Sequence, residues 1–248
     1  MRGPAWLTAR PVAHRGYHDP TAGRVENTVA AVEAAIARGF AVECDIQLSR
    51  DDVPVAFHDD TLERLAGTRA VVSSLTIAEL KAVPLIGTAD RIPTLPELLA
   101  VVAGRVPLFV EFKSRFDGNR RLEQVAAPLL AAYSGPLAVM SFDPRSVIAL
   151  ARLATDRPRG LVADSFTHKY WQAIPLARRF ALRHLLAAPL AAPSFVAYGV
   201  HDLPANAPLF LRHLGVPLLA WTVRSAADRA TARRYADQII FEGFDPDA

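Results

Sequence analysis

The chain of 248 residues contains a single cysteine, Cys44, which excludes an intrachain disulfide framework. It also lacks a long uninterrupted apolar run. Its most apolar stretch, residues 182–200, is broken by an arginine, a histidine and two prolines, so no membrane-spanning helix is predicted. The N-terminus shows no charged segment followed by an apolar one, so no secretory signal peptide is predicted. The expected location is therefore the cytoplasm, without stable membrane insertion.

Strong net charge is missing as well. The 28 lysines and arginines nearly balance 25 aspartates and glutamates, and arginine greatly outnumbers lysine. Arginines cluster in residues 178–183 and 224–234, a pattern typical of solvated helix faces, with attraction of anionic substrates or lipid surfaces as the alternative. No aromatic residues alternate with a basic stripe, so nucleic acid is not a predicted partner.

The chain has no Gly-x-Gly-x-x-Gly turn after its first predicted strand, which disfavours a dinucleotide-binding open sheet. It does have short apolar runs alternating with helical patterns, which predicts a parallel sheet covered by helices. The expected strands are residues 11–15, 41–48, 106–113, 136–142, 160–163, 195–200, 217–223 and 238–242. Eight such strands predict an α/β fold, the (β/α)8 or TIM-type barrel, with a doubly wound sheet as the alternative.

Helical patterns fall between these strands. The clearest covers residues 27–38 and ends at Gly39. Further helices are expected to begin near residues 94, 119, 144, 171, 206 and 225. The chain as a whole, residues 1–248, is predicted to be one barrel domain.

Two parts of the chain depart from the alternation. Residues 59–93 hold only one short expected helix, at 77–83, and we predict that they form a small insertion after the second strand, over the barrel mouth. Only six residues follow Glu242, which leaves little room for an eighth helix. Residues 3–8 are therefore expected to cover that gap.

Three carboxylates fall on two of the predicted strands. Glu43 and Asp45 are two residues apart, so they share one face of a strand while Cys44 points the other way, toward the helix layer. Buried carboxylates this close repel each other unless positive charge lies between them. Glu111 on the next strand completes an oxygen-rich set that is suited to a divalent cation, Mg²⁺ or Ca²⁺. Zinc is disfavoured, because paired cysteines are absent.

Basic side chains converge on the same end of the predicted barrel. His14 and Arg15 end the first strand, Lys113 follows Glu111 by two residues, and His58 follows an apolar run. Each alone has an ordinary interpretation, such as a turn residue, a rim charge or a salt-bridge partner. Together they favour a catalytic site, because barrel enzymes place catalytic groups at the carboxyl ends of the strands. Cationic donors, a metal and two histidines suit phosphoryl transfer.

Seven short segments occur along the chain in a specific order and spacing: His14-Arg15-Gly16, Glu26-Asn27-Thr28, Glu43-x-Asp45, Phe57-His58-Asp59, Ile92-Pro93-Thr94-Leu95, Glu111-Phe112-Lys113 and Trp221-Thr222-Val223. In that order and spacing they resemble the glycerophosphodiester phosphodiesterase family, over most of the chain. The resemblance implies a TIM-type barrel enzyme, a phosphoric diester hydrolase that converts glycerophosphodiesters to sn-glycerol 3-phosphate and an alcohol. It also implies a divalent cation on Glu43, Asp45 and Glu111, with His14 and His58 as the acid/base pair.

The remaining site predictions concern the substrate. Arg15 and Lys113 are expected to bind its phosphate, and Trp221 to form an apolar pocket wall, with ordinary barrel packing as the alternative. Arg224 and Glu242 differ from the residues usual in the family near the last two strands, and we expect these differences to affect substrate details rather than the chemistry. The predicted partner is thus a small glycerophosphodiester, and no oligomeric state is predicted.

Two other functions fit the same sequence. The first is a lysophospholipase D-type phosphodiesterase on the same scaffold, in which apolar residues of the insertion, Leu75, Ile77, Leu80, Leu85 and Ile86, would line an acyl groove. Those residues also fit a small core of the insertion, which is the favoured interpretation. The second is a non-catalytic binding barrel, which the full set of acids and bases disfavours.

Overall fold

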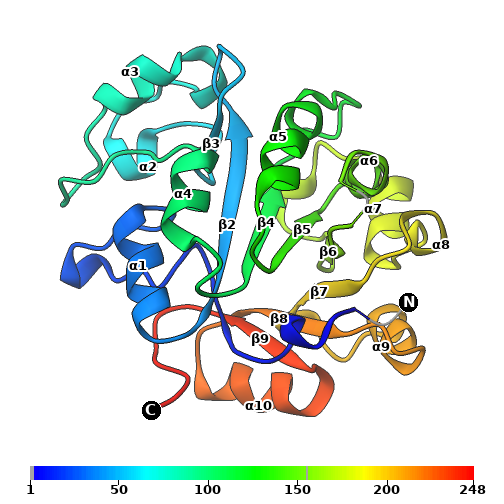
Figure 1. Ribbon diagram of the computed structural model, residues 1–248. Helices are drawn as coiled ribbons and strands as arrows, with labels where there is room; N and C mark the ends of the chain where they lie inside the picture. Colours follow the sequence, from blue (N-terminus) through cyan, green and yellow to red (C-terminus); the bar gives the residue numbers. More distant parts are fainter. Residues whose placement is uncertain (1–2, 155) are drawn as a thin grey trace.

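The computed structural model in Figure 1 describes residues 3–154 and 156–248. Its parallel strands are β1 (Val12–Ala13), β2 (Ala41–Leu48), β4 (Leu108–Phe112), β5 (Leu137–Ser141), β6 (Arg159–Ala163), β7 (Phe195–Gly199), β8 (Leu218–Val223) and β9 (Gln238–Phe241). Because β1 pairs with both β2 and β9, the sheet closes on itself. The predicted (β/α)8 barrel is therefore confirmed, and the open-sheet alternative is wrong.

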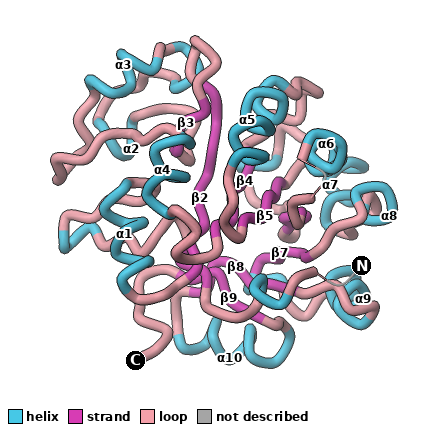
Figure 2. The backbone as a smooth tube through the Cα atoms, in the orientation of Figure 1, coloured by secondary structure: helices cyan, strands magenta, loops and turns pink. Residues whose placement is uncertain are grey.

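Helices surround the strands, as Figure 2 shows. They are α1 (Val29–Ala37), α4 (Leu95–Val102), α5 (Arg121–Ala132), α6 (Pro144–Leu153), α7 (Leu176–Arg183), α8 (Ala188–Ala191), α9 (Asn206–His213) and α10 (Ala226–Tyr235). Local sequence sets their starts: Thr94 and Glu97 form a capping box at α4, and Ser225 caps α10. Among the described residues, no helix is both long and apolar enough to cross a membrane.

One helix begins later than expected. The pattern predicts a helix from about residue 171, but only the 3-10 turn η4 (Lys169–Trp171) forms there, and α7 starts at Leu176. Pro175 precedes α7 as its N-cap. Because proline disfavours helical geometry in the residue before it, a continuous helix through this point is not expected.

The predicted insertion contains more structure than one helix. After β3 (Pro54–Ala56), which pairs antiparallel with β2, the chain forms α2 (Glu63–Ala66), the 3-10 turn η3 (Val72–Ser74) and α3 (Ile77–Ala82) (Figure 1). A separate hydrophobic cluster holds these elements together. Its members include Leu62, Val72, Leu75, Ile77, Leu80 and Leu85. Leu75, Ile77, Leu80 and Leu85 thus belong to a small core, as the favoured interpretation predicts, whereas Ile86 is largely exposed. None of the five lines the large cavity of the barrel, so they form no acyl groove there.

Side chains on the strands alternate between the barrel interior and the helix layer. On β2, Ala41 belongs to the interior cluster, whereas Val42 and Cys44 belong to the cluster beneath the helices. Glu43 and Asp45 have the same parity as Ala41 and therefore point into the barrel. The predicted orientation of Cys44, fully buried toward the helices, is confirmed.

The N-terminal segment closes the barrel interior rather than replacing a helix. The 3-10 turn η1 (Ala5–Leu7) places Leu7 in the interior cluster and Trp6 edge-to-face against Phe109, with ring centroids 5.9 Å apart. Phe109 also meets Phe195, the first residue of β7, at 5.6 Å. Residues 3–8 therefore cover the N-terminal ends of the strands, opposite the end where the carboxylates lie.

We expect Phe109→Ala to destabilise the protein by roughly 3–5 kcal/mol, because it leaves a cavity between the rings of Trp6 and Phe195. The free energy of unfolding from guanidinium denaturation checks this. Phe210→Ala, at a largely exposed position, is the control and should cost within about 0.5 kcal/mol. Equal effects of the two substitutions would contradict the interpretation of Phe109 as a central packing residue.

Candidate active site

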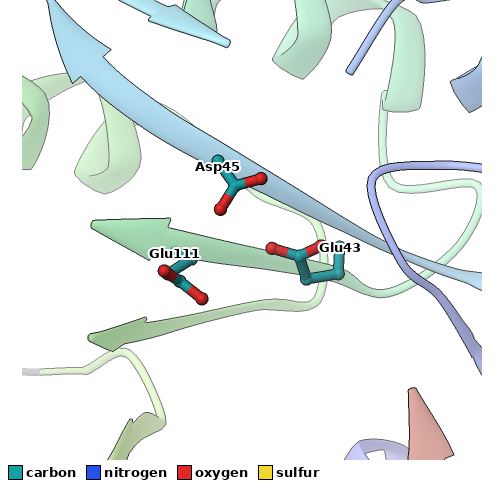
Figure 3. Close-up of side chains that lie close together, drawn as sticks. All are labelled: Glu43, Asp45 and Glu111. Atoms are coloured by element: carbon teal, nitrogen blue, oxygen red, sulfur yellow. The ribbon is translucent and has the colours of Figure 1, made fainter. Parts of the chain in front are cut away.

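Three carboxylates meet inside the barrel at the carboxyl ends of β2 and β4. In the strand register Asp45 lies opposite Glu111, and Glu43 lies one step below on the same face. One oxygen from each of Glu43, Asp45 and Glu111 lies within 4.8 Å of the others. All three side chains are buried, and Figure 3 shows them directed toward the same space.

The electrostatics of this cluster are unequal. Burial and the negative charges of Asp45 and Glu111 raise the pKa of Glu43 well above its usual value. Burial acts the same way on Asp45, but Lys113, His58 and Arg15 outweigh it and lower the pKa of Asp45. Asp45 is therefore ionised. Glu43 has too little positive charge beside it to stay ionised.

The cluster fits a divalent cation. Glu43 Oε1 is buried and has no hydrogen-bond partner among the residues that the structure describes, which is costly for a carboxylate unless another ligand satisfies it. A cation among Glu43, Asp45 and Glu111 would satisfy that oxygen and remove the repulsion that raises the pKa of Glu43. Mg²⁺, Ca²⁺ and Mn²⁺ all accept carboxylate oxygens.

The segment after β1 supports the acids through its backbone and side chains. The Arg15 amide donates to Glu43 Oε2 at 2.8 Å. Asn27 donates from Nδ2 to Asp45 Oδ2, and its Oδ1 accepts from the Asp45 amide, both at 3.1 Å. Gly16 lies where a Cβ would approach the Ala31 backbone to 2.8 Å, so the close passage of this loop over α1 requires glycine.

The two predicted phosphate-binding cations lie beside the acids. Arg15 Nε is 3.2 Å from Asp45 Oδ2, and Lys113 Nζ is 3.0 Å from Glu111 Oε1 and 3.4 Å from Asp45 Oδ1. Burial lowers the pKa of each cation, but neighbouring carboxylates outweigh it and raise both above the usual values. Arg15 and Lys113 therefore stay charged. Glu26 also holds Arg15 in place, with Glu26 Oε1 2.7 Å from Arg15 Nη1.

His14 is held by a carboxylate that the sequence reasoning did not include in the site. Its Nδ1 lies 2.5 Å from Glu242 Oε2, and Arg224 Nε donates to the other Glu242 oxygen at 2.6 Å. Burial would raise the pKa of Glu242, but the hydrogen bonds from His14 and Arg224, together with nearby His18, outweigh it and lower that pKa. Glu242 was expected to affect only substrate details, yet it contacts the predicted catalytic histidine directly.

His58 is held in the same way. Its Nδ1 lies 2.7 Å from Asp59 Oδ1, and Arg64 Nε donates to Asp59 Oδ2 at 2.7 Å. Hydrogen bonds from His58 and Arg64 outweigh the effect of burial and lower the pKa of Asp59. Arg64 also donates to Glu26, which links this chain of contacts to Arg15.

These contacts fix which ring nitrogen of each histidine is available. An ionised carboxylate only accepts hydrogen bonds, so Nδ1 of His14 and Nδ1 of His58 each carry a proton. The opposite nitrogen, Nε2, is then left to take or give a proton. For His14 this nitrogen lies 4.0 Å from Glu43 Oε2, at the acid cluster.

All eight predicted site residues line one cavity of about 630 Å³. They are His14, Arg15, Glu43, Asp45, His58, Glu111, Lys113 and Trp221. The Trp221 ring packs edge-to-face on Phe142 at 5.3 Å, so Trp221 both lines the cavity and packs in the barrel. Asp60 and Ser73 of the insertion also line the cavity, in agreement with an insertion at the barrel mouth.

Three other histidines differ in their relation to the site. His18 Nε2 lies 3.5 Å from Glu242 Oε2, so His18 stands beside the carboxylate that holds His14. His168 lines the cavity, although no motif in the sequence assigns it to the site. His201 is largely exposed and lies beside Asp228, away from the acid cluster.

The fold and this cavity define a TIM-barrel protein whose interior holds a buried, cation-fitting acid cluster with two oriented histidines beside it. The sequence model of the glycerophosphoryl diester phosphodiesterase family matches residues 14–242, a span that includes every one of these groups. The chain belongs to this family.

Relatives of known name agree with this membership. A glycerophosphodiester phosphodiesterase of Caldanaerobacter subterraneus is 32% identical over 231 residues, covering 88% of this chain and 86% of that protein. A probable glycerophosphodiester phosphodiesterase 1 of Mycobacterium tuberculosis is 31% identical over 179 residues. That second match covers 62% of this chain and 64% of the relative, slightly less than two thirds of its length.

Solved structures share the fold. An Oleispira antarctica phosphodiesterase in complex with the product sn-glycerol-3-phosphate superposes with a TM-score of 0.78 at 21% identity, covering 95% of this chain and 93% of that one. A Thermotoga maritima glycerophosphodiester phosphodiesterase gives a TM-score of 0.70 at 22% identity, covering 94% of both chains.

The raised pKa of Glu43 predicts that cation binding is linked to proton release. In the cation-free protein Glu43 holds its proton up to a higher pH than an ordinary glutamate, and a cation must displace that proton. Affinity for Mg²⁺ or Mn²⁺ should therefore fall as pH decreases, by up to about tenfold per pH unit for one proton. Calorimetric titration at several pH values measures this.

Glu43→Gln, which removes the titrating group, should weaken cation binding and flatten its dependence on pH. Glu33→Gln is the control, because Glu33 pairs with Arg105 at 2.7 Å on the surface. A cation affinity of the unmodified protein that does not change with pH would contradict the proposed protonation of Glu43.

Proposed function

We propose that this protein hydrolyses glycerophosphodiesters to sn-glycerol 3-phosphate and an alcohol. The observation that carries the proposal is the pairing of two oriented histidines, His14 and His58, with the carboxylate cluster in one cavity. Family membership and the product-bound relative from Oleispira antarctica support it. The cavity is large enough for a small phosphodiester rather than a polymer.

The acid cluster would hold the divalent cation, Mg²⁺ or Ca²⁺. When bound on Glu43, Asp45 and Glu111, the cation supplies positive charge that offsets the phosphoryl oxygens of the substrate. Arg15 and Lys113 line the cavity beside these acids and remain charged, so they bind the same phosphoryl oxygens and stabilise the charge that builds up in the transition state.

The histidines move the protons. One accepts the proton of the attacking oxygen, which is water or the neighbouring glycerol hydroxyl, as a new P–O bond forms. The other donates a proton to the departing alcohol oxygen as its P–O bond breaks. In the hydroxyl route a cyclic phosphate forms first, and water then opens it to the same phosphomonoester. Glu242 and Asp59 hold the two rings with Nε2 available for these transfers.

A lysophospholipid is the second candidate substrate, and the aromatic lining of the cavity supports it. Its aromatic wall contains Phe142, Trp171 and Trp221, with Phe142 and Trp171 centroids 5.0 Å apart. Such a wall suits the acyl chain that a lysophospholipid carries on its glycerol, which stays with the phosphate when the headgroup alcohol departs. Assays with glycerophosphocholine and lysophosphatidylcholine in parallel distinguish the two substrates.

His14→Ala and His58→Ala should each lower kcat by at least ~10²-fold, since each removes one partner of acid–base catalysis. Release of glycerol 3-phosphate from glycerophosphocholine, measured with chelated enzyme to which Mg²⁺, Ca²⁺ or Mn²⁺ is returned, provides the assay. His213→Ala, on an exposed imidazole at the end of α9, is the control. Near-normal turnover in either site variant would contradict the role of that histidine in acid–base catalysis. Activity that survives complete chelation would contradict the role of the cation.

Glu242→Gln tests the orientation of His14. The substitution keeps the size of the side chain but allows an amide donor to face Nδ1, which favours the wrong tautomer. We expect kcat to fall by roughly 10–100-fold, the range seen when a functional histidine loses its carboxylate partner. KM should change little. Glu242→Asp should retain more activity than Glu242→Gln if charge and acceptor character matter, and the reverse order would argue for a purely steric role.

A further inference from the structure

Apolar side chains gather on the surface of one segment. Half of the large hydrophobic residues that are exposed in the described part of the chain lie within residues 170–190. They are Tyr170, Leu176, Phe180, Leu186 and Leu190. Leu176 and Leu190 are 75% and 79% exposed, so they contribute almost nothing to the protein's own packing. Figure 1 places α7 and α8, in yellow, on the outside of the barrel.

The same part of the chain carries charge of one sign. Residues 165–201 contain no aspartate or glutamate, and their cations are Lys169, Arg178, Arg179 and Arg183. Of these four, Arg178 alone has a carboxylate within ion-pair distance in the described part of the chain, Asp143 at 3.8 Å. The charge on the other three is thus not neutralised by a neighbouring acid.

Helical spacing puts the apolar and basic groups together on α7. Leu176, Phe180 and Arg183 follow each other at four and three residues, so they occupy one face of the helix. Leu182 is buried and Arg178 bends inward to stack on Phe116, which places the opposite face of α7 against the barrel. The outward face of α7 is therefore apolar and positively charged.

This surface borders the candidate active site. Tyr170 lines the cavity and is also among the exposed residues, and its ring stands edge-to-face on Trp171 at 5.0 Å. Ala173 and Ile174 also line the cavity, and α7 begins two residues after Ile174. The exposed face thus continues from the cavity lining along α7.

We propose that this face, comprising Lys169, Tyr170 and the outward side of α7, docks the protein reversibly on an anionic lipid surface. Long apolar side chains mixed with arginines are what such a surface binds, since the apolar groups enter the headgroup boundary and the cations attract anionic lipids. A second copy of this chain is a poor occupant. A symmetric dimer would set this face against itself, with cations opposing cations and no acids within residues 165–201 to pair with them.

Vesicle binding tests the proposal without use of substrate, so its outcome is independent of the proposed hydrolysis. The protein should co-sediment with vesicles of phosphatidylglycerol and phosphatidylcholine, and much less with pure phosphatidylcholine. High salt should weaken the binding, because the attraction is partly electrostatic. Leu176→Ser/Phe180→Ser should lower the partition coefficient by about tenfold or more, from the loss of two large apolar groups.

Matched controls exist elsewhere on the surface. Phe210 and Leu214 have the same four-residue spacing and are 61% and 62% exposed, but Arg212 between them pairs with Asp237 at 2.9 Å. Phe210→Ser/Leu214→Ser should leave vesicle binding unchanged. Arg183→Glu should reduce binding, whereas Arg233→Glu on α10 should not.

Several results would overturn the proposal. One is an absence of binding to anionic vesicles, and another is an equal loss of binding in the control pair and the α7 pair. A dimer in solution that Leu176→Ser/Phe180→Ser converts to a monomer would instead assign the face to a second copy. Since Leu176 and Phe180 do not line the cavity, their variant should keep the activity of the unmodified protein on soluble glycerophosphocholine.

Discussion

Electrostatic repulsion among Glu43, Asp45 and Glu111 is the constraint on which the arrangement at the carboxyl ends of the strands depends. Three buried carboxylates within 4.8 Å cannot all remain ionised without compensation. Arg15, Lys113 and the Asn27 amide compensate Asp45, which is why its pKa stays low. Within the described part of the chain, one oxygen of Glu43 accepts a hydrogen bond from the Arg15 amide and the other has no hydrogen-bond partner. A cation bound among the three carboxylates would remove that deficit.

The two histidines of the cavity are also held by pairs of opposite charges. Each site histidine donates Nδ1–H to a carboxylate, and an arginine in turn holds that carboxylate, which gives the chains Arg224–Glu242–His14 and Arg64–Asp59–His58. Carboxylates that are kept ionised by arginine fix the imidazole tautomer and orientation more firmly than a neutral partner would. Two similar chains on one cavity are consistent with a reaction in which one histidine accepts a proton and the other donates one.

The barrel separates packing from chemistry along its axis. At the N-terminal end of the strands, Leu7, Phe109 and Phe195 fill the interior with apolar side chains. Toward the carboxyl end, the same interior positions of β2 and β4 hold Glu43, Asp45 and Glu111. Apolar packing at the N-terminal end offsets the free-energy cost of burying charge at the other end. The loops and helices beyond the strands, including α7, are then available to determine which surfaces the cavity meets.

Sequence alone determined the eight parallel strands, most helix starts, and the placement of Glu43, Asp45 and Glu111 on inward faces, because strand and helix periodicities are local properties that residue spacing records. It also identified eight of the residues that line the cavity, through motifs whose members are close in sequence. It did not predict the short antiparallel strand β3. Only the tertiary structure decided the partners of His14. Glu242 is 228 residues away, and the closure of the barrel through β1 and β9 brings the two together. The outward face of α7 was likewise undetermined, because exposure depends on which side of the helix the barrel covers.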